Sequence, residues 1–382
     1  MEIIHIVFFV LVFLILYSYA VYPLILKILA ILINRKVPYH ENSPSISIII
    51  SVYNEENVIR KKLENALQLE YPKSLKEILV VSDCSNDNTD SIVKEYADKG
   101  VVLMASRERR GKTAGLNDAV ARASGEIIVF TDADAMFYPG ALKRMTGLLA
   151  NKMVGLVTGS TQYVSEEEGE MVETSSIYTK LEKFIKYQES QINSCVGADG
   201  AIFAMKKYLY KSLKDDDIND LVIPLKVVRQ GYRVILDNEL VCVEEPSSSS
   251  SNEFNRQIRI TNRTLRGIFR HFDLFNIFKF PFFSFELLSH KLIRLSVPFY
   301  LLLLLPLNII LLPDSIFYAL IMIGQIVFYL MAFIGYFSVD STGLMAKSTV
   351  FYHFVMVQIA VLLGWVNYLL GNKQVTWKPG NR

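Results

Sequence analysis

The sequence has few cysteines, few histidines and almost no excess of charge of either sign. Its three cysteines among 382 residues are odd in number and widely spaced, which excludes a disulfide framework and a cysteine zinc site. The five histidines are scattered, so the pattern predicts no histidine-ligated metal. Lysine and arginine number 40 against 38 acidic residues, whereas a protein that follows nucleic-acid phosphates needs a basic surplus. We therefore expect a reduced, cytosolic soluble part and no nucleic-acid partner.

Long apolar runs, by contrast, are abundant, and 51% of the residues are hydrophobic. Residues 3–33 carry almost no charge apart from Lys27, and about 20 apolar residues suffice to span a bilayer. The run is longer than a signal-peptide core and no small-residue cleavage site follows it, which predicts an N-terminal transmembrane helix over residues 1–34. Arg35 and Lys36 follow directly, so we expect this end to be cytosolic and the N-terminus to lie outside.

The rest of the chain divides into a soluble part and a second apolar part. We expect a cytosolic domain at 35–272, an interfacial amphipathic helix at 273–291, three transmembrane helices within 292–371 (apolar runs at 292–312, 315–337 and 349–370), and a tail at 372–382. Four spans would place the C-terminus outside, whereas Lys373, Lys378 and Arg382 favour the inside. Either one run is re-entrant, or the charge rule is weak for so few charges.

Short β-branched runs alternate with helix-like segments in the soluble domain. Strands are expected at residues 45–52, 77–81, 101–104 and 126–131, and helices between them at 54–69, 89–99 and 113–123. Apolar strands separated by helices are typical of an α/β fold with a parallel sheet covered on both faces. Ligands of such sheets bind beyond the carboxyl ends of the strands, so polar clusters should collect there.

Polar side chains do follow these expected strands. Glu55 comes after the first strand, Asp83 after the second, and the pair Asp132 and Asp134 after the fourth. At a strand end both carboxylates of an Asp-x-Asp pair can approach one site, and Mg²⁺ commonly uses one or two carboxylates plus substrate phosphates. For each acid taken alone, a turn or helix cap is the simpler interpretation. Lys112 stands where a helix should begin, which favours a phosphate site over a solvated basic turn.

Two later segments add acidic candidates. Gly197, Asp199 and Gly200 belong to a tight, glycine-bounded turn. Asp220 closes an acidic run that leads into an apolar helix. Such an acid usually caps the helix, but one that faces a ligand cleft would serve as a general base for a hydroxyl group.

Arginines recur at helical spacing before the second apolar region, at residues 256, 259, 263, 266 and 270. They form either a stripe for lipid headgroups or an arm that holds a diphosphate. Both alternatives stay open for Arg263, Arg266 and Arg270, whereas for Arg259 we favour the diphosphate.

Taken in this order, the segments between residues 45 and 270 resemble the inverting family 2 glycosyltransferases, most of all the membrane branch with cellulose, chitin and hyaluronan synthases. The resemblance implies a nucleotide-diphospho-sugar transferase domain of the GT-A, Rossmann-like type beside α-helical transmembrane segments. It implies donor contacts for Glu55, Asp83, Lys112, Asp132 and Arg259, a metal ligand in Asp134, acceptor contacts for Gly197, Asp199 and Gly200, and the catalytic base in Asp220.

The chain departs from this branch near the membrane. The synthases carry a Gln-x-x-Arg-Trp segment, and alignment on Arg259 places Arg256 at the Gln position and Ile260 at the Trp position. Because that Trp helps to bind the acceptor chain end in the family, the departure favours addition of a single sugar over long-chain polymerisation.

We therefore expect a multi-pass cell-membrane enzyme with a cytosolic catalytic domain. It would use Mg²⁺ or Mn²⁺ to move a hexose or N-acetylhexosamine from a nucleotide sugar, with UDP as the family-level carrier, to a polysaccharide or lipid-linked acceptor. One alternative is a single-addition glycolipid transferase. A membrane transporter is a remote alternative, because the apolar runs hold almost no ionisable residue apart from Lys27 and His353. Membrane lipid is an expected partner, and a homo-oligomer stays open.

Overall fold

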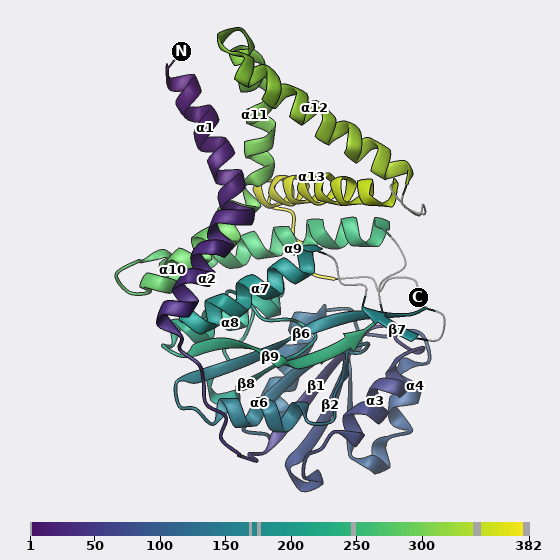
Figure 1. The fold of residues 1–382 in the computed structure, drawn as a ribbon. Helices are drawn as coiled ribbons and strands as arrows, with labels where there is room; N and C mark the ends of the chain where they lie inside the picture. The colour runs from purple at the N-terminus through teal and green to yellow at the C-terminus, as the bar shows by residue number, and fades with distance from the viewer. Residues whose placement is uncertain (1, 168–169, 174–176, 246–249, 339–344, 377–382) are drawn as a thin grey trace. The chain divides into compact units, whose positions relative to one another are not determined.

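A computed structural model describes residues 2–167, 170–173, 177–245, 250–338 and 345–376 (Figure 1). The chain divides into two compact units, each assembled from separate stretches of sequence. The helical unit comprises Met1–Ile25, Ser250–Leu265 and Leu288–Asn372, and the sheet unit comprises Leu26–Ser249, Arg266–Leu287 and Lys373–Arg382.

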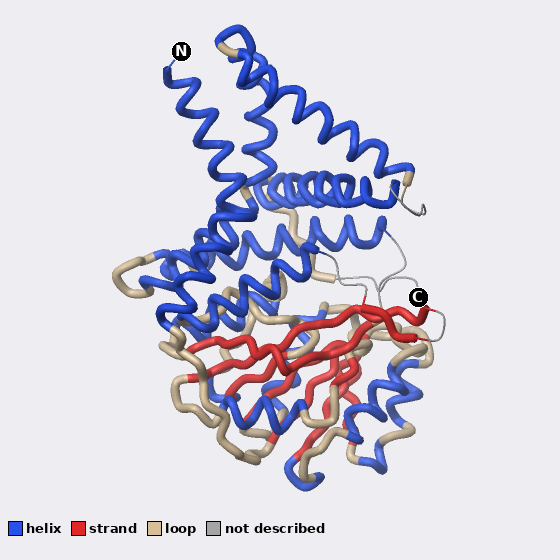
Figure 2. The backbone as a smooth tube through the Cα atoms, viewed as in Figure 1, coloured by secondary structure: helices blue, strands red, loops and turns tan. Residues whose placement is uncertain are grey.

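The sheet unit is built on a mixed β-sheet, whose strands are red in Figure 2. The strands are β1 (Ile46–Val52), β2 (Lys76–Ser82), β3 (Val101–Ala105), β4 (Ile127–Asp132), β5 (Met136–Phe137), β6 (Val154–Glu167), β7 (Glu170–Glu173), β8 (Phe203–Lys206) and β9 (Arg233–Glu244). Their order across the sheet is β3-β2-β1-β4-β8-β6-β9-β5, and β7 pairs with β6 outside this path.

Half of this sheet is parallel, as the sequence predicts, and the other half is mixed. β3, β2, β1 and β4 are parallel neighbours, whereas β8 runs antiparallel to both β4 and β6. All seven residues of β1 are buried, which explains its continuous apolar sequence. The parallel half brings the carboxyl ends of β1, β2 and β4 to one edge of the sheet.

The helices of the sheet unit pack on this sheet, and the three that were expected at 54–69, 89–99 and 113–123 begin or end within a few residues of those positions. The helices of this unit include α3 (Ile59–Gln68), α4 (Thr89–Lys94), α5 (Lys112–Arg122), α6 (Ala141–Leu149), α7 (Ile177–Ile192) and α8 (Asn219–Arg229). Helix α9 (Ser250–Arg270) is divided between the units. Its residues up to Leu265 belong to the helical unit, and those from Arg266 onwards belong to the sheet unit.

The helical unit holds the long apolar helices. They are α1 (Glu2–Leu16), α11 (Val297–Leu311), α12 (Ile316–Phe337) and α13 (Thr349–Leu369). A π-helical turn joins α1 to α2 (Tyr22–Ile33), which belongs to the sheet unit from Leu26 onwards. Within the described residues, four stretches are long and apolar enough to cross a membrane: Glu2–Ile33, Val297–Asp314, Ile316–Phe337 and Thr349–Leu369. These stretches match the four apolar runs of the sequence.

The segment expected as one amphipathic helix over residues 273–291 is instead broken into short pieces. A 3-10 turn at Phe272–Phe275 precedes α10 (Pro281–Leu287), and a π-helical turn follows. The Asn276 side chain accepts a backbone hydrogen bond from Phe278 at 3.0 Å. The next helix then starts at Pro281, a residue that is tolerated in a first turn but cannot continue a preceding helix. The prediction of one continuous helix is therefore wrong.

Candidate functional site

The loops after β1 and β2 are locked together at the carboxyl edge of the sheet. The backbone N–H of Asn54 donates to the Ser85 hydroxyl at 3.1 Å, and the Asn54 side chain accepts from the backbone of Asn86 at 2.9 Å. The backbone N–H of Glu55 donates to the Thr89 hydroxyl at 2.8 Å. These bonds place Glu55 on the loop that lies against the one following Asp83.

Asp83 is buried, with 5% exposure, and it organises the segment before α5. One carboxylate oxygen accepts the backbone N–H groups of Arg110 at 2.8 Å and Gly111 at 3.0 Å. The Arg109 guanidinium lies 3.7 Å from the other oxygen and 3.6 Å from the centroid of the Tyr53 ring. Asp83 therefore fixes the start of α5, the helix that begins with Lys112.

Lys112 forms an ion pair with Asp132 at the end of β4. Burial alternates from Thr131 to Phe137, so Asp132 and Asp134 are partly exposed and Ala133 between them is buried. β4 ends at Asp132 and the chain bends at Ala133 and Asp134, so both carboxylates stand at the strand end.

The described residues contain no cluster of three or more His, Cys, Asp or Glu side chains that could hold a metal. The carboxylates that stand together at the end of β4 are the pair Asp132 and Asp134. That pair fits a hard divalent cation, because Mg²⁺ usually takes one or two protein carboxylates and completes its shell with water and substrate phosphates.

Lys62 lies behind this acidic segment and was missed by the sequence reasoning. It belongs to the buried face of α3 together with Ile59, Leu63 and Ala66. Burial lowers the pKa of Lys62 to about 8, and the nearby charges of Asp132 and Asp134 oppose that shift. A lysine inside an otherwise apolar helical stripe is the signal in the sequence that could have identified it.

A second group of residues surrounds Asp220, in the first turn of α8. The backbone N–H of Ala198 donates to the Asp220 carbonyl at 2.6 Å. A Cβ placed on Gly200 would lie 3.5 Å from a carboxylate oxygen of Asp220. Gly197 has φ +95°, a conformation that favours glycine. The glycine turn and Asp220 are therefore in direct contact, as the predicted acceptor side requires.

Asp199 and Lys186 stabilise this turn from either side. The Asp199 carboxylate accepts the backbone N–H groups of Thr161 at 2.8 Å and Ala201 at 3.1 Å. Lys186, on α7, donates to the Ala198 carbonyl at 3.0 Å. Nothing in the local sequence marked Lys186, because its partner is a backbone carbonyl of a distant segment.

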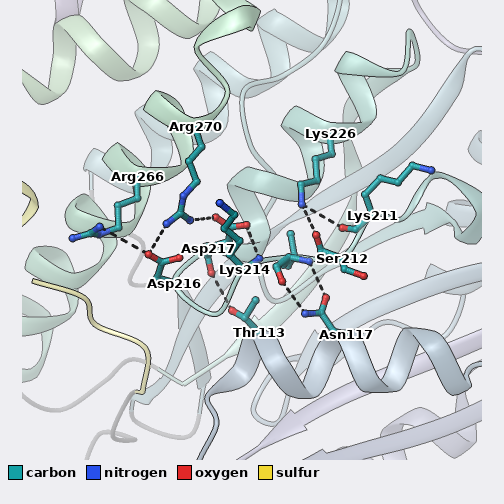
Figure 3. Close-up of polar contacts among 11 residues, drawn as sticks. Thr113, Asn117, Lys211, Ser212, Lys214, Asp216, Asp217, Lys226, Arg266 and Arg270 are labelled. Carbon is teal, nitrogen blue, oxygen red and sulfur yellow. Dashed lines mark hydrogen bonds and ion pairs between the residues drawn. The ribbon is translucent and has the colours of Figure 1, made fainter. Parts of the chain in front are cut away.

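The acidic loop before α8 contacts α5 through Thr113 and α9 through Arg266 and Arg270, as Figure 3 shows. The Thr113 hydroxyl, one residue after Lys112, donates to the Asp217 carbonyl at 3.0 Å. Arg270 contacts the carboxylates of Asp216 and Asp217, each at 2.5 Å, and Arg266 lies 3.9 Å from Asp216.

These pairs change the interpretation of the arginine run. Arg266 and Arg270 hold the acidic loop, whereas we expected a lipid stripe or a diphosphate arm. Arg259 belongs to the helical unit, whereas the other predicted donor residues belong to the sheet unit. Burial lowers the pKa of Arg259 to about 10, and the charges of Arg263 and Arg256 add to the shift.

Comparison with known proteins agrees with the resemblance seen in the sequence. Residues 47–213 match the family described as Glycosyl transferase family 2. The chain is 27% identical over 223 residues to the probable glycosyltransferase YdaM of Bacillus subtilis, covering 52% of this chain and 51% of that protein. It is 26% identical over 210 residues to the poly-beta-1,6-N-acetyl-D-glucosamine synthase of Staphylococcus epidermidis, covering 53% and 50%. The chain thus spans about half the length of these curated relatives.

Among solved structures, the chain resembles the mannosyltransferase PcManGT from Pyrobaculum calidifontis, solved in complex with GDP-Man and Mn²⁺. The TM-score is 0.76 at 20% identity, and the match covers 97% of this chain and 100% of that chain. This likeness confirms the expected GT-A fold, with its mixed sheet and packed helices. Over residues 47–213 the chain is similar to the glycosyl transferase family 2 model.

Proposed function

We propose that the protein is a membrane-bound, metal-dependent inverting glycosyltransferase. It would transfer a hexose or N-acetylhexosamine from a nucleotide diphosphate-sugar to a polysaccharide or lipid-linked acceptor. The observation that carries the proposal is the link between two groups of side chains at the carboxyl edge of the sheet. Lys112 and Asp132 form one group, and Asp220 belongs to the other. The hydrogen bond from Thr113 to Asp217 joins α5, which begins with Lys112, to the loop that precedes Asp220.

On the donor side, the base and ribose would lie against Glu55 and Asp83, on the two interlocked loops. Lys112 would turn from Asp132 towards the diphosphate, because a helix N-terminus and a lysine together attract phosphate. Asp134 would bind the cation with help from Asp132, and Arg259 is a further diphosphate contact in this proposal. A bound Mg²⁺ or Mn²⁺ would supply neutralisation of the charge on the departing diphosphate.

On the acceptor side, Asp220 would act as the general base. Its carboxylate would take the proton of an acceptor hydroxyl while that oxygen forms a bond to the anomeric carbon. The bond from this carbon to the diphosphate oxygen breaks on the opposite side, so an α-linked donor gives a β-linked product. Gly197, Asp199 and Gly200 support the role, because a glycine turn leaves room for a sugar beside the carboxylate.

The membrane setting of the proposal comes from the apolar helices. Residues 1–34 and two or more helices within residues 292–371 would span the bilayer, and residues 35–272 would form the cytosolic catalytic domain. The beta-monoglucosyldiacylglycerol synthase of Trichormus variabilis is 33% identical over 141 residues, covering 35% of this chain and 30% of that protein. Its name denotes a glycolipid product. That relative and the Arg256 and Ile260 departures favour a single addition to a lipid as the second candidate.

The test is transfer by the purified full chain in lipid vesicles. Labelled UDP- and GDP-sugars would be supplied with Mg²⁺ or Mn²⁺, and the labelled product would be sized. A ladder or high-mass product indicates a polymerase, and one lipid-soluble product indicates the glycolipid transferase. If no donor in the panel gives either sugar transfer or release of nucleoside diphosphate, the proposed activity is wrong.

A further inference from the structure

Lys62 is buried to 1% exposure, in the sheet unit and away from solvent. A buried ammonium group costs several kcal/mol unless hydrogen bonds and opposite charges compensate for lost hydration. An apolar side chain of similar length would fill the same space on α3 without that cost. What the ammonium group contacts is therefore the feature that needs an explanation.

Its contacts bracket the acidic segment at the end of β4. The Lys62 Nζ donates to the Thr131 hydroxyl at 2.7 Å and also to the Ala135 carbonyl. Thr131 directly precedes Asp132, and Ala135 directly follows Asp134. One ammonium group thus ties both ends of the segment that carries the two carboxylates.

A third contact holds the lysine itself. Its Nζ lies 4.4 Å from the centroid of the Phe137 ring, on β5. Such a contact stabilises a desolvated cation and limits the positions that its long side chain can adopt. The ammonium group is therefore a fixed point between α3, β4 and β5.

We propose that Lys62 is a positioning residue that holds the Asp132–Asp134 segment in the shape required to bind a divalent cation. The proposal rests on the proposed metal-dependent function. Partners that lie behind metal ligands fix the ligand orientation, and their loss typically costs 10–100-fold in metal affinity. Lys62 would act in this way through Thr131 and the Ala135 peptide, without touching the metal.

Removal of Lys62 could also strengthen metal binding, so the direction of the change in affinity distinguishes two roles for this residue. A cation behind two carboxylates repels a second cation, so a purely electrostatic role predicts tighter metal binding when Lys62 is removed. A positioning role predicts weaker binding, because both ends of the segment are released.

The test is Mn²⁺ affinity of the full chain in detergent micelles, measured by electron paramagnetic resonance with Mn²⁺ alone and with UDP or GDP. For Lys62→Met we expect affinity about 10–100-fold weaker than for the wild type. Thr131→Val removes one of the two acceptors and should shift affinity in the same direction by less. This second variant carries the test if Lys62→Met fails to fold.

Lys76→Met is the matched control. The Lys76 Nζ also donates to backbone carbonyls, those of Ala66, Leu67 and Leu69, but at the start of β2, the strand end opposite the site. The Lys76→Met variant should have a lower melting temperature than the wild type and a Mn²⁺ affinity within about twofold of the wild-type value. Unchanged or tighter Mn²⁺ binding in folded Lys62→Met would overturn the positioning role. Absence of Mn²⁺ binding in the wild type would overturn the proposed metal dependence, and this inference with it.

Discussion

At the scale of single residues, Asp220 is the proposed base, and the glycine turn lies against it. In Asp220→Asn we expect kcat to fall by about 10²–10⁴-fold, the usual contribution of a general base. Donor affinity should change little, since the proposed donor contacts lie on other segments. Comparing single-turnover rates with donor binding by calorimetry measures both quantities. A loss of donor affinity as large as the loss of rate would show that Asp220 is not the base.

Gly111 offers a second prediction at this scale, with a matched control. It has φ +86°, and a Cβ there would lie 2.8 Å from the Val375 carbonyl oxygen. Gly100 has nearly the same φ, +84°, with nothing within 4 Å of its Cβ position. Gly100→Ala should lose about 1 kcal/mol of stability from its left-handed backbone. Gly111→Ala should lose more, because its ψ of 158° lies in a region open essentially to glycine alone and its Cβ would meet Val375. Only Gly111→Ala should also weaken donor binding, because Gly111 joins Asp83 to α5. Equal donor affinity in the two variants would contradict this placement.

The residues that sequence reasoning could reach are those whose role is local. Asp83, Asp132 and Asp134 follow apolar strands, and such strands are readable from a short window. Lys62 showed in the sequence only as a charge in an apolar stripe, and Lys186 did not show at all, because the contacts of both depend on the fold. Their partners are a threonine hydroxyl and backbone carbonyls from segments far along the chain. Every residue has a backbone carbonyl, so the sequence does not show which one accepts a hydrogen bond.

At the scale of elements, local pattern predicted the parallel strands and not the strands that follow. The first four strands, β1 to β4, occur within a few residues of their expected positions. Each of them is apolar, and a helix separates each one from the next. β8 pairs antiparallel with β4 and β6 across long stretches of sequence. Direction and order of that kind depend on tertiary packing, which no local periodicity encodes.

Arg270 belongs to this scale, because it joins α9 to the loop before α8. In Arg270→Gln, Asp216 and Asp217 lose their nearest cation, and we expect about 2 kcal/mol less stability, between the cost for an exposed pair and a buried one. Lys143→Gln, which removes the exposed pair with Glu70, should cost far less. Urea unfolding of both variants gives the comparison.

The pH dependence of this difference has a definite sign. Burial acts to raise the pKa of Asp216, but the hydrogen bond and charge of Arg270 outweigh it and lower the pKa. A lowered carboxyl pKa contributes stability above the unfolded-state value, and the contribution is lost as the pH falls through the folded value. The difference between wild type and Arg270→Gln should therefore shrink below about pH 4. A difference that stays constant down to pH 3 would contradict the ion-pair account.

At the scale of the whole molecule, one contact bears on how the chain crosses the membrane. The Val375 backbone lies against Gly111, and both residues belong to the sheet unit. In the proposed membrane setting, the tail and the sheet unit would then lie on the same side of the bilayer, with an even number of crossings between them. Within the described residues, the three long apolar helices α11, α12 and α13 precede the tail. The short turn Leu312–Asp314 joins α11 and α12 as a hairpin, and we expect α13 not to cross.

Accessibility to a membrane-impermeant maleimide tests this topology. Pro313→Cys, in the turn between α11 and α12, should react from outside the cell. Thr376→Cys should react only after permeabilisation, as should Asp98→Cys, a marker in the catalytic domain. This outcome would agree with the lysines of the tail, which favour the inside. Labelling of Thr376→Cys from outside would mean that α13 crosses the bilayer.

The central claim is that a divalent cation on Asp134 is required for sugar transfer at this edge of the sheet. The most direct measurement is release of nucleoside diphosphate and labelled product as Mn²⁺ is titrated into metal-stripped wild type and Asp134→Ala. We expect wild-type turnover to rise from near zero with Mn²⁺ and to vanish with a chelator, and the variant to stay inactive at every Mn²⁺ concentration. Near-normal turnover of Asp134→Ala, or wild-type turnover that does not respond to metal, would contradict the account.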